Sequence, residues 1–178
     1  MRAAWIILVT TIGLFLTGSQ VALALDTVYQ EPAEFLQDQL PGCRKQVLWL
    51  DQAAKARIAN VTGRPFPGVR ARYCERDGKT GWILDEIGKT EPITSGVIVA
   101  GGRVERLRVL IFRESRGAEV PRAGFTRQYR LASLDDKGRL DRRIDGITGA
   151  TLSVAAVNRQ VRLALLLDEL VRSESNDH

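Results

Sequence analysis

PITSGVIVAGGRVERLRVLIF, residues 92–112, is the stretch that decides the fold class. It contains two apolar runs rich in β-branched residues, separated by the pair Gly101-Gly102. Such runs favour strands, and Gly-Gly suits a tight hairpin because glycine tolerates positive φ. The stretch therefore predicts two neighbouring antiparallel strands.

The same pattern continues toward the N-terminus. VRARY, residues 69–73, alternates with period two, and GWILDEI, residues 81–87, follows a turn that carries Asp77-Gly78. Four consecutive strands joined by short turns are typical of an antiparallel meander. Beyond an irregular region, LDRRI at residues 140–144 predicts one more short strand.

Three segments have helical spacing. Residues 32–39 and residues 51–60, the latter ending near Gly63, predict two short packing helices, and residues 152–171 predict a long C-terminal helix that buries most of its surface. The expected fold is therefore an α+β domain in which an antiparallel meander packs against helices.

The chain divides into four parts. We expect a signal peptide at residues 1–24, an N-terminal helical packing segment at 25–67, a main domain at 68–172 and a polar tail at 173–178. The signal is predicted from Arg2, an apolar run and the small-residue pattern Ala22-Leu23-Ala24, so the mature protein is expected in the periplasm or another extracytoplasmic space. The alternative is an uncleaved segment that anchors the chain in the inner membrane.

Two cysteines suit an exported protein. Cys43 and Cys74 are expected to form a disulfide, the alternative being two separate buried thiols. The formal net charge of +5 comes without an arginine-rich segment interleaved with aromatics, so no nucleic-acid partner is expected. Arg106 and Arg108 share one face of their predicted strand, which favours a solvated face or a basic docking patch.

The chain has very few side chains for unaided redox or group-transfer chemistry. Its only histidine is His178 and its only methionine is Met1. This excludes histidine-assisted nucleophiles, histidine-ligated zinc and haem ligation by this chain alone. Any redox or group-transfer role must therefore rest on a cofactor that carries its own chemistry.

The segment DGITGAT, residues 145–151, directly precedes the long predicted helix. It has three possible roles: a turn that caps the helix, a cradle for free phosphate, or a hydroxyl to which a group is covalently attached. A phosphate cradle is disfavoured because both GxxxxGK[ST] and GxGxxG are absent. A phosphate esterified to Thr151 would be stabilised at the positive end of the helix.

Asp145 through Thr151 resemble the D-G-x-[ST]-G-A-T flavinylation motif of the FMN-binding domain family. The resemblance implies that an FAD-dependent flavin transferase places FMN on Thr151 through a phosphoester bond. It implies that Gly149 and Ala150 leave room for the transferase and donate N–H groups to the phosphate. Gly146 is a second glycine at which the backbone N–H can approach the phosphate closely. It further implies that Thr148 bonds backbone or phosphate, and that Asp145 fixes the turn or is recognised by the transferase.

A second part of the resemblance is the loop Glu114-Ser115-Arg116-Gly117, which is similar to the E-T-P-G loop near the flavin ring in related pumping complexes. Arg116 stands where that loop has proline. The resemblance implies that Glu114 and Ser115 meet the ring, and that the protein is an electron carrier beside a membrane redox partner. The alternatives are a cofactor-free binding or assembly module, and a reductase acting on its own substrate.

Overall fold

The computed structural model describes residues 26–176. The predicted signal peptide, and with it the alternative of an uncleaved anchor, lies outside these residues. Within residues 26–176, no helix combines the length and apolar character needed to cross a membrane.

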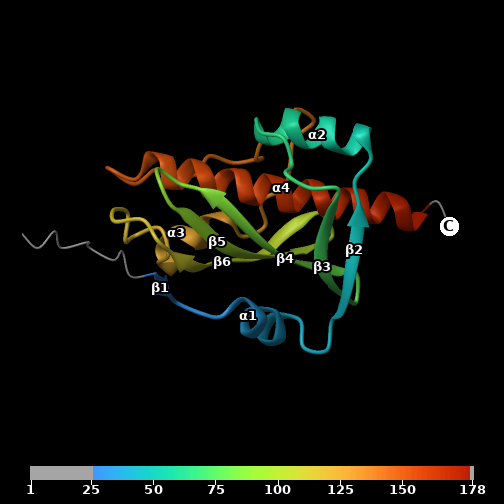
Figure 1. The fold of residues 1–178 in the computed structure, drawn as a ribbon, viewed down its shortest axis with the longest axis horizontal. Helices are drawn as coiled ribbons and strands as arrows, with labels where there is room; N and C mark the ends of the chain where they lie inside the picture. Colours follow the sequence, from blue (N-terminus) through green and yellow to red (C-terminus); the bar gives the residue numbers. More distant parts are fainter. Residues whose placement is uncertain (1–25, 177–178) are drawn as a thin grey trace, which may run out of the picture.

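The centre of the fold is a six-stranded antiparallel sheet with strand order β1-β6-β5-β4-β3-β2 (Figure 1). The strands are β1 (Thr27–Val28), β2 (Arg44–Trp49), β3 (Arg70–Arg76), β4 (Lys79–Ile87), β5 (Pro92–Ala100) and β6 (Arg103–Phe112). The predicted meander is confirmed as β3 to β6. Both residues of each predicted turn have positive φ: 51° and 71° at Asp77-Gly78, 56° and 73° at Gly101-Gly102.

Two local expectations need correction. The segment 25–67, expected to be helical, also supplies the outer strands β1 and β2, and β2 pairs with β3 along its whole length. As an edge strand, β2 leaves Val47 and Trp49 exposed, so its apolar alternation is weak. Residues 140–144 form no strand; only an isolated bridge joins Leu134 to Leu140, and Asp141 binds Ser133 through its side chain instead.

The predicted helices are all present. They are α1 (Pro32–Gln39), α2 (Gln52–Thr62) and α4 (Thr151–Asn176), with two short pieces, α3 (Ala123–Thr126) and the 3₁₀ turn η1 (Arg127–Tyr129). The Asp51 side chain caps α2 by accepting from the Ala54 N–H at 2.7 Å. α4 runs further than expected, through Asn176 and so into the polar tail.

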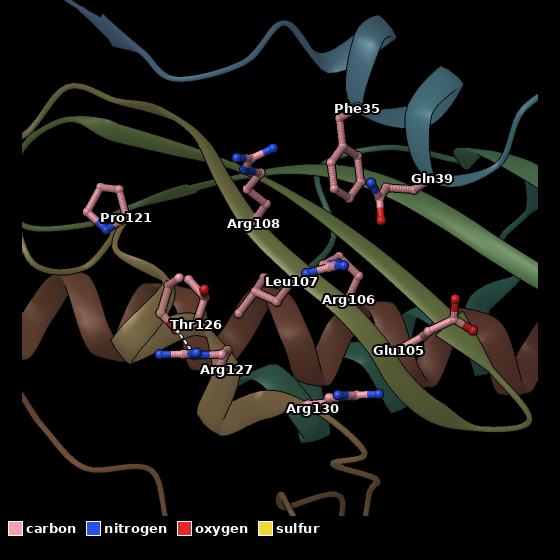
Figure 2. Close-up of a pocket in the computed structure, with 11 residues that line it drawn as sticks. Phe35, Gln39, Glu105, Arg106, Leu107, Arg108, Pro121, Thr126, Arg127 and Arg130 are labelled. Atoms are coloured by element: carbon pink, nitrogen blue, oxygen red, sulfur yellow. Dashed lines mark hydrogen bonds between the residues drawn. The ribbon is translucent and has the colours of Figure 1, made fainter.

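The helices lie on both faces of the sheet, with α4 and α2 on one side and α1 on the other (Figure 1). The main core lies under α4, where Trp82, Val97 and Val157 are fully buried. A smaller core lies under α1, where the buried Phe35 ring points toward the sheet (Figure 2). Gly96 makes this possible, because a Cβ at that position would overlap the Phe35 ring.

Buried polar groups fix α4 on the sheet. The Gln160 amide Nε2 donates to the carbonyls of Leu84 and Ile93, each at 2.7 Å, and the Ser95 hydroxyl donates to its Oε1 at 2.8 Å. Further along the helix, fully buried Asp168 accepts a hydrogen bond from Thr80 Oγ1 at 2.7 Å. Because an unpaired buried polar group is costly, these contacts set the position of α4 along the sheet and therefore place its N-terminus.

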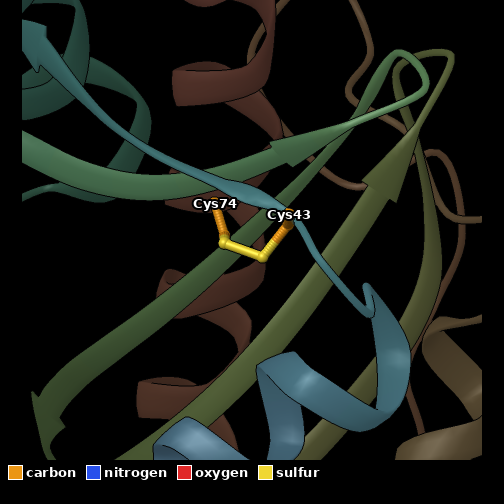
Figure 3. Close-up of a disulfide and its surroundings, with 2 residues drawn as sticks. All are labelled: Cys43 and Cys74. Atoms are coloured by element: carbon orange, nitrogen blue, oxygen red, sulfur yellow. A yellow bond between two sulfur atoms is a disulfide. The ribbon is translucent and has the colours of Figure 1, made fainter.

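The predicted disulfide between Cys43 and Cys74 is confirmed (Figure 3). It joins the segment just before β2 to β3, and the two Cα atoms lie 5.5 Å apart. Closing a loop of 31 residues contributes about 3–4 kcal/mol in the chain-entropy model. The bond therefore ties the N-terminal segment to the meander.

Candidate functional site

The segment before α4 makes a tight turn. The Ala150 N–H donates to the Ile147 carbonyl at 3.0 Å, and Gly149 has a φ of +79°. A turn with positive φ at its third residue favours glycine there. The Ala150 carbonyl then accepts the Val154 N–H at 2.9 Å, so Ala150 is the N-cap and Thr151 is the first helical residue.

This geometry does not support a capping role for Thr151. The N-cap position holds alanine, whose side chain offers no hydrogen-bond acceptor. Thr151 is exposed, and within residues 26–176 its hydroxyl forms no hydrogen bond. The N–H groups of Thr151, Leu152 and Ser153 likewise find no acceptor in that part of the chain. The start of α4 therefore presents three free donors and a free hydroxyl, an arrangement that favours an anion.

The N–H of Ala150 already has an acceptor within the turn, the Ile147 carbonyl, so the turn as it stands does not offer this N–H to a phosphate. The donors of the first helical turn belong to the next three residues instead. Ala150 itself is buried, so its methyl group helps to form the floor beneath the turn.

Glu114 lies beside this turn but has a structural task of its own. Its Oε1 accepts the N–H of Thr90 at 2.9 Å, that of Glu91 at 3.2 Å, and that of Lys89. Desolvation raises the pKa of Glu114, but the hydrogen bonds from these N–H groups outweigh it, so the net pKa lies below the ordinary value. The carboxylate therefore holds the connection between β4 and β5 in place.

A cavity of about 560 Å³ lies where these two loops meet. Its lining consists of Lys89, Thr90, Glu114, Ser115, Arg116, Gly149, Ala150, Thr151, Leu152 and Ser153. The structure thus brings the two predicted parts of the site together. The volume lies in the range of small-molecule and cofactor sites, about 300–1,000 Å³.

Several lining residues were missed by the sequence analysis. Lys89 and Arg116 supply two positive charges, and Leu152 supplies an apolar side chain that is 53% exposed. The motif gives no indication of Lys89, because it lies on a different connection. An apolar residue at the start of an amphipathic helix is expected to be buried, and Leu152 is not.

Asp145, Gly146 and Thr148 are exposed and do not line the cavity. The Asp145 N–H donates to Gln128 Oε1 at 2.7 Å, while its carboxylate forms no hydrogen bond to residues 26–176. The turn is therefore not held by the Asp145 side chain. Of the two roles expected for that side chain, recognition by another protein is the one that this placement favours.

The fold and this cavity define an α+β domain in which the free N–H groups at the start of α4 lie beside a cofactor-sized pocket. Residues 88–166 match the FMN-binding domain family, the family whose flavinylation motif residues 145–151 resemble. No curated protein and no solved structure gives a significant match. The matched range includes every residue that lines the cavity.

The residues present fit the cofactor that this domain binds. FMN carries a phosphate, which suits the free N–H groups of the first turn of α4 and the charges of Lys89 and Arg116. It also carries a flat ring system, which suits an exposed apolar side chain such as Leu152.

Proposed function

We propose that this protein is an extracytoplasmic electron-transfer flavoprotein that carries FMN covalently on Thr151. The observation that supports this most strongly is the state of the Thr151 side chain. It is exposed, it lies at the edge of a cofactor-sized cavity, and its hydroxyl forms no hydrogen bond within residues 26–176. A threonine with no local structural task is therefore available for attachment.

The proposed attachment is a phosphoryl transfer, in which a phosphoanhydride bond of FAD is exchanged for a phosphoester to Thr151. A bond forms between Thr151 Oγ1 and the phosphorus of the FMN half of FAD, the pyrophosphate bond breaks, AMP leaves, and the hydroxyl loses its proton. An external FAD-dependent transferase supplies the catalysis. The part of this chain is to present Oγ1 beside the free N–H groups of Thr151, Leu152 and Ser153, which stabilise the phosphate.

The proposed role is that of a carrier between a membrane reductase and an acceptor. FMN supplies one- and two-electron exchange when bound. The chain would orient the cofactor: α4 is fixed by the contacts of Gln160, and the loop of Ser115 and Arg116 lines the same cavity as the start of α4. Lys89 and Arg116 set the positive potential around the site.

Thr151→Ala and Thr151→Ser test the attachment. Each variant is produced with the transferase, and flavin that stays with the denatured polypeptide is measured by absorbance and intact mass. Thr151→Ala is expected to lose all covalent flavin and Thr151→Ser to keep part of it. Because Thr151 is exposed, its loss is expected to change stability by no more than about 0.5 kcal/mol.

Thr148→Ala is the matched control, since it removes an exposed hydroxyl from the same motif. It is expected to keep covalent flavin to a greater extent than Thr151→Ala. Flavin that stays bound to Thr151→Ala after denaturation would show that another residue is the attachment point. An unmodified wild-type chain from a transferase-competent host would instead support a cofactor-free binding or assembly module.

Two further measurements address the rest of the proposal. The secreted form is expected to begin at Leu25, so its intact mass lacks the first 24 residues of the sequence; a full-length chain in the membrane fraction would indicate an anchor. A carrier is expected to be reduced by a chemical donor and then reoxidised stoichiometrically. Sustained turnover of a specific substrate would indicate a reductase.

A further inference from the structure

A basic groove lies on the opposite face of the sheet from α4. It consists of two adjoining cavities, of about 430 and 800 Å³, between α1 and the α3–η1 segment. In Figure 2, Arg106 and Arg108 extend from β6 along its floor, and Arg127 and Arg130 lie on the α3–η1 wall. Among the described residues, the groove shares no lining residue with the cavity beside Thr151, which is called the flavin cavity after the proposed cofactor.

The charge of this groove is unbalanced. Its charged lining residues are Lys79, Arg103, Glu105, Arg106, Arg108, Arg127 and Arg130. Glu105, the one acid among these described lining residues, is already paired with Lys79 at 2.7 Å. Within residues 26–176, Arg106, Arg127 and Arg130 form no ion pair with a carboxylate. All three are exposed, so their guanidinium groups remain available to a ligand.

Two arginines of the groove have neutral hydrogen-bond partners. The Arg127 Nε–H donates to the Ala123 carbonyl at 3.1 Å, so the preceding helix α3 orients the guanidinium. Arg108 donates to Gln30 Oε1 at 2.7 Å, so it has a neutral partner rather than a carboxylate. At Arg108 and Arg127 the positive charge is therefore oriented by neutral groups and is not cancelled, whereas Arg103 lies 3.7 Å from the Asp141 carboxylate.

We propose that this groove docks an extended acidic segment of a partner protein. The planar guanidinium of arginine pairs with carboxylates in a bidentate way. A groove with a floor and two walls admits a polypeptide, whereas a flat lipid surface contacts protruding side chains. Since the groove and the flavin cavity are separate, docking requires no flavin.

A titration of the full chain with a fluorescein-labelled peptide of alternating Glu and Ala, followed by anisotropy, tests this proposal. Arg106→Gln combined with Arg130→Gln is expected to weaken binding about tenfold, and the fold should survive because neither side chain forms an ion pair within residues 26–176. The charge-matched control, Arg70→Gln with Arg72→Gln on β3, is expected to change binding less than about twofold.

Glu105→Gln provides a test in the opposite direction. It removes the one acid found among the described residues that line the groove, and it is expected to tighten peptide binding several-fold. Binding is also expected to weaken as salt rises. The proposal is overturned if the two double variants weaken peptide binding equally, or if Glu105→Gln weakens it. It is also overturned if phosphatidylglycerol vesicles bind to the groove, as judged by loss of binding in Arg106→Gln with Arg130→Gln, while the peptide does not bind.

Discussion

Gly117 lies directly against Ala150: a Cβ added at Gly117 would come within 2.8 Å of the Ala150 Cβ. Gly117 also has a φ of +86°, which disfavours any side chain. The contact joins the loop that carries Glu114 and Ser115 to the turn that leads into Thr151. The two halves of the flavin cavity are therefore held together by a glycine packed on an alanine.

We expect Gly117→Ala to separate these halves. The added methyl meets Ala150 and the backbone is strained, so the variant should lose about 1–3 kcal/mol of unfolding free energy and incorporate less flavin. Thermal unfolding and covalent flavin content measure the two effects. Gly124→Ala is the control, because a Cβ there has no neighbour within 4 Å. Equal behaviour of the two variants would contradict the close contact.

Much of the fold could be predicted because it depends on local patterns. The turns at Asp77-Gly78 and Gly101-Gly102 need positive φ, and Asp51 and Gly63 mark the ends of α2. β2 was missed because an edge strand needs no apolar face on its solvent side. Its identity depends on pairing with β3, which is a tertiary contact.

In the candidate site, too, local features could be predicted from the sequence and tertiary contacts could not. Gly149 and Thr151 could be assigned from the motif, since a turn and a helix start are local features. The alanine N-cap, the use of the Glu114 carboxylate by the 89–91 backbone, and the placement of Lys89 in the cavity depend on how two distant connections meet. No spacing within the motif contains that information.

Gly146→Ala is expected to leave the stability of the fold unchanged and to lower the extent of flavin attachment. A Cβ at Gly146 meets no atom within 4 Å and the φ of this residue is not positive, so stability should change by less than about 0.5 kcal/mol. If the transferase needs close approach to the exposed motif, covalent flavin should fall nonetheless. Initial rates of flavinylation with purified transferase check this. A normal rate would show that Gly146 is not read by the transferase.

Glu114→Gln is expected to remove a pH-dependent contribution to stability. The folded pKa of Glu114 is lowered, so its ionised carboxylate stabilises the protein above the unfolded pKa of about 4.3, and this contribution is lost as pH falls through the folded pKa. At neutral pH the variant should lose roughly 1–3 kcal/mol, because the hydrogen bonds to Thr90 and Glu91 weaken. Below the folded pKa its stability should approach that of the wild type.

Denaturant unfolding from pH 7 to pH 3 measures this difference. Glu119→Gln is the control, since Glu119 is exposed in the same segment and forms no ion pair within residues 26–176. A constant difference between wild type and Glu114→Gln over the whole range would show that the Glu114 carboxylate does not hold the 89–91 backbone through its charge.

Lys89→Gln combined with Arg116→Gln is expected to lower the flavin midpoint potential. Both cations line the cavity, and positive charge stabilises the more electron-rich reduced cofactor. Two exposed charges contributing together about 1–2 kcal/mol correspond to a shift of roughly 20–40 mV for a two-electron couple. Lys45→Gln with Arg72→Gln removes the same charges from β2 and β3, outside the cavity, and should shift the potential by much less. Redox titration of the flavin absorbance, at equal flavin content, measures both shifts. Equal shifts in the two double variants would show that only the net charge of the protein matters and that Lys89 and Arg116 do not act at the cofactor.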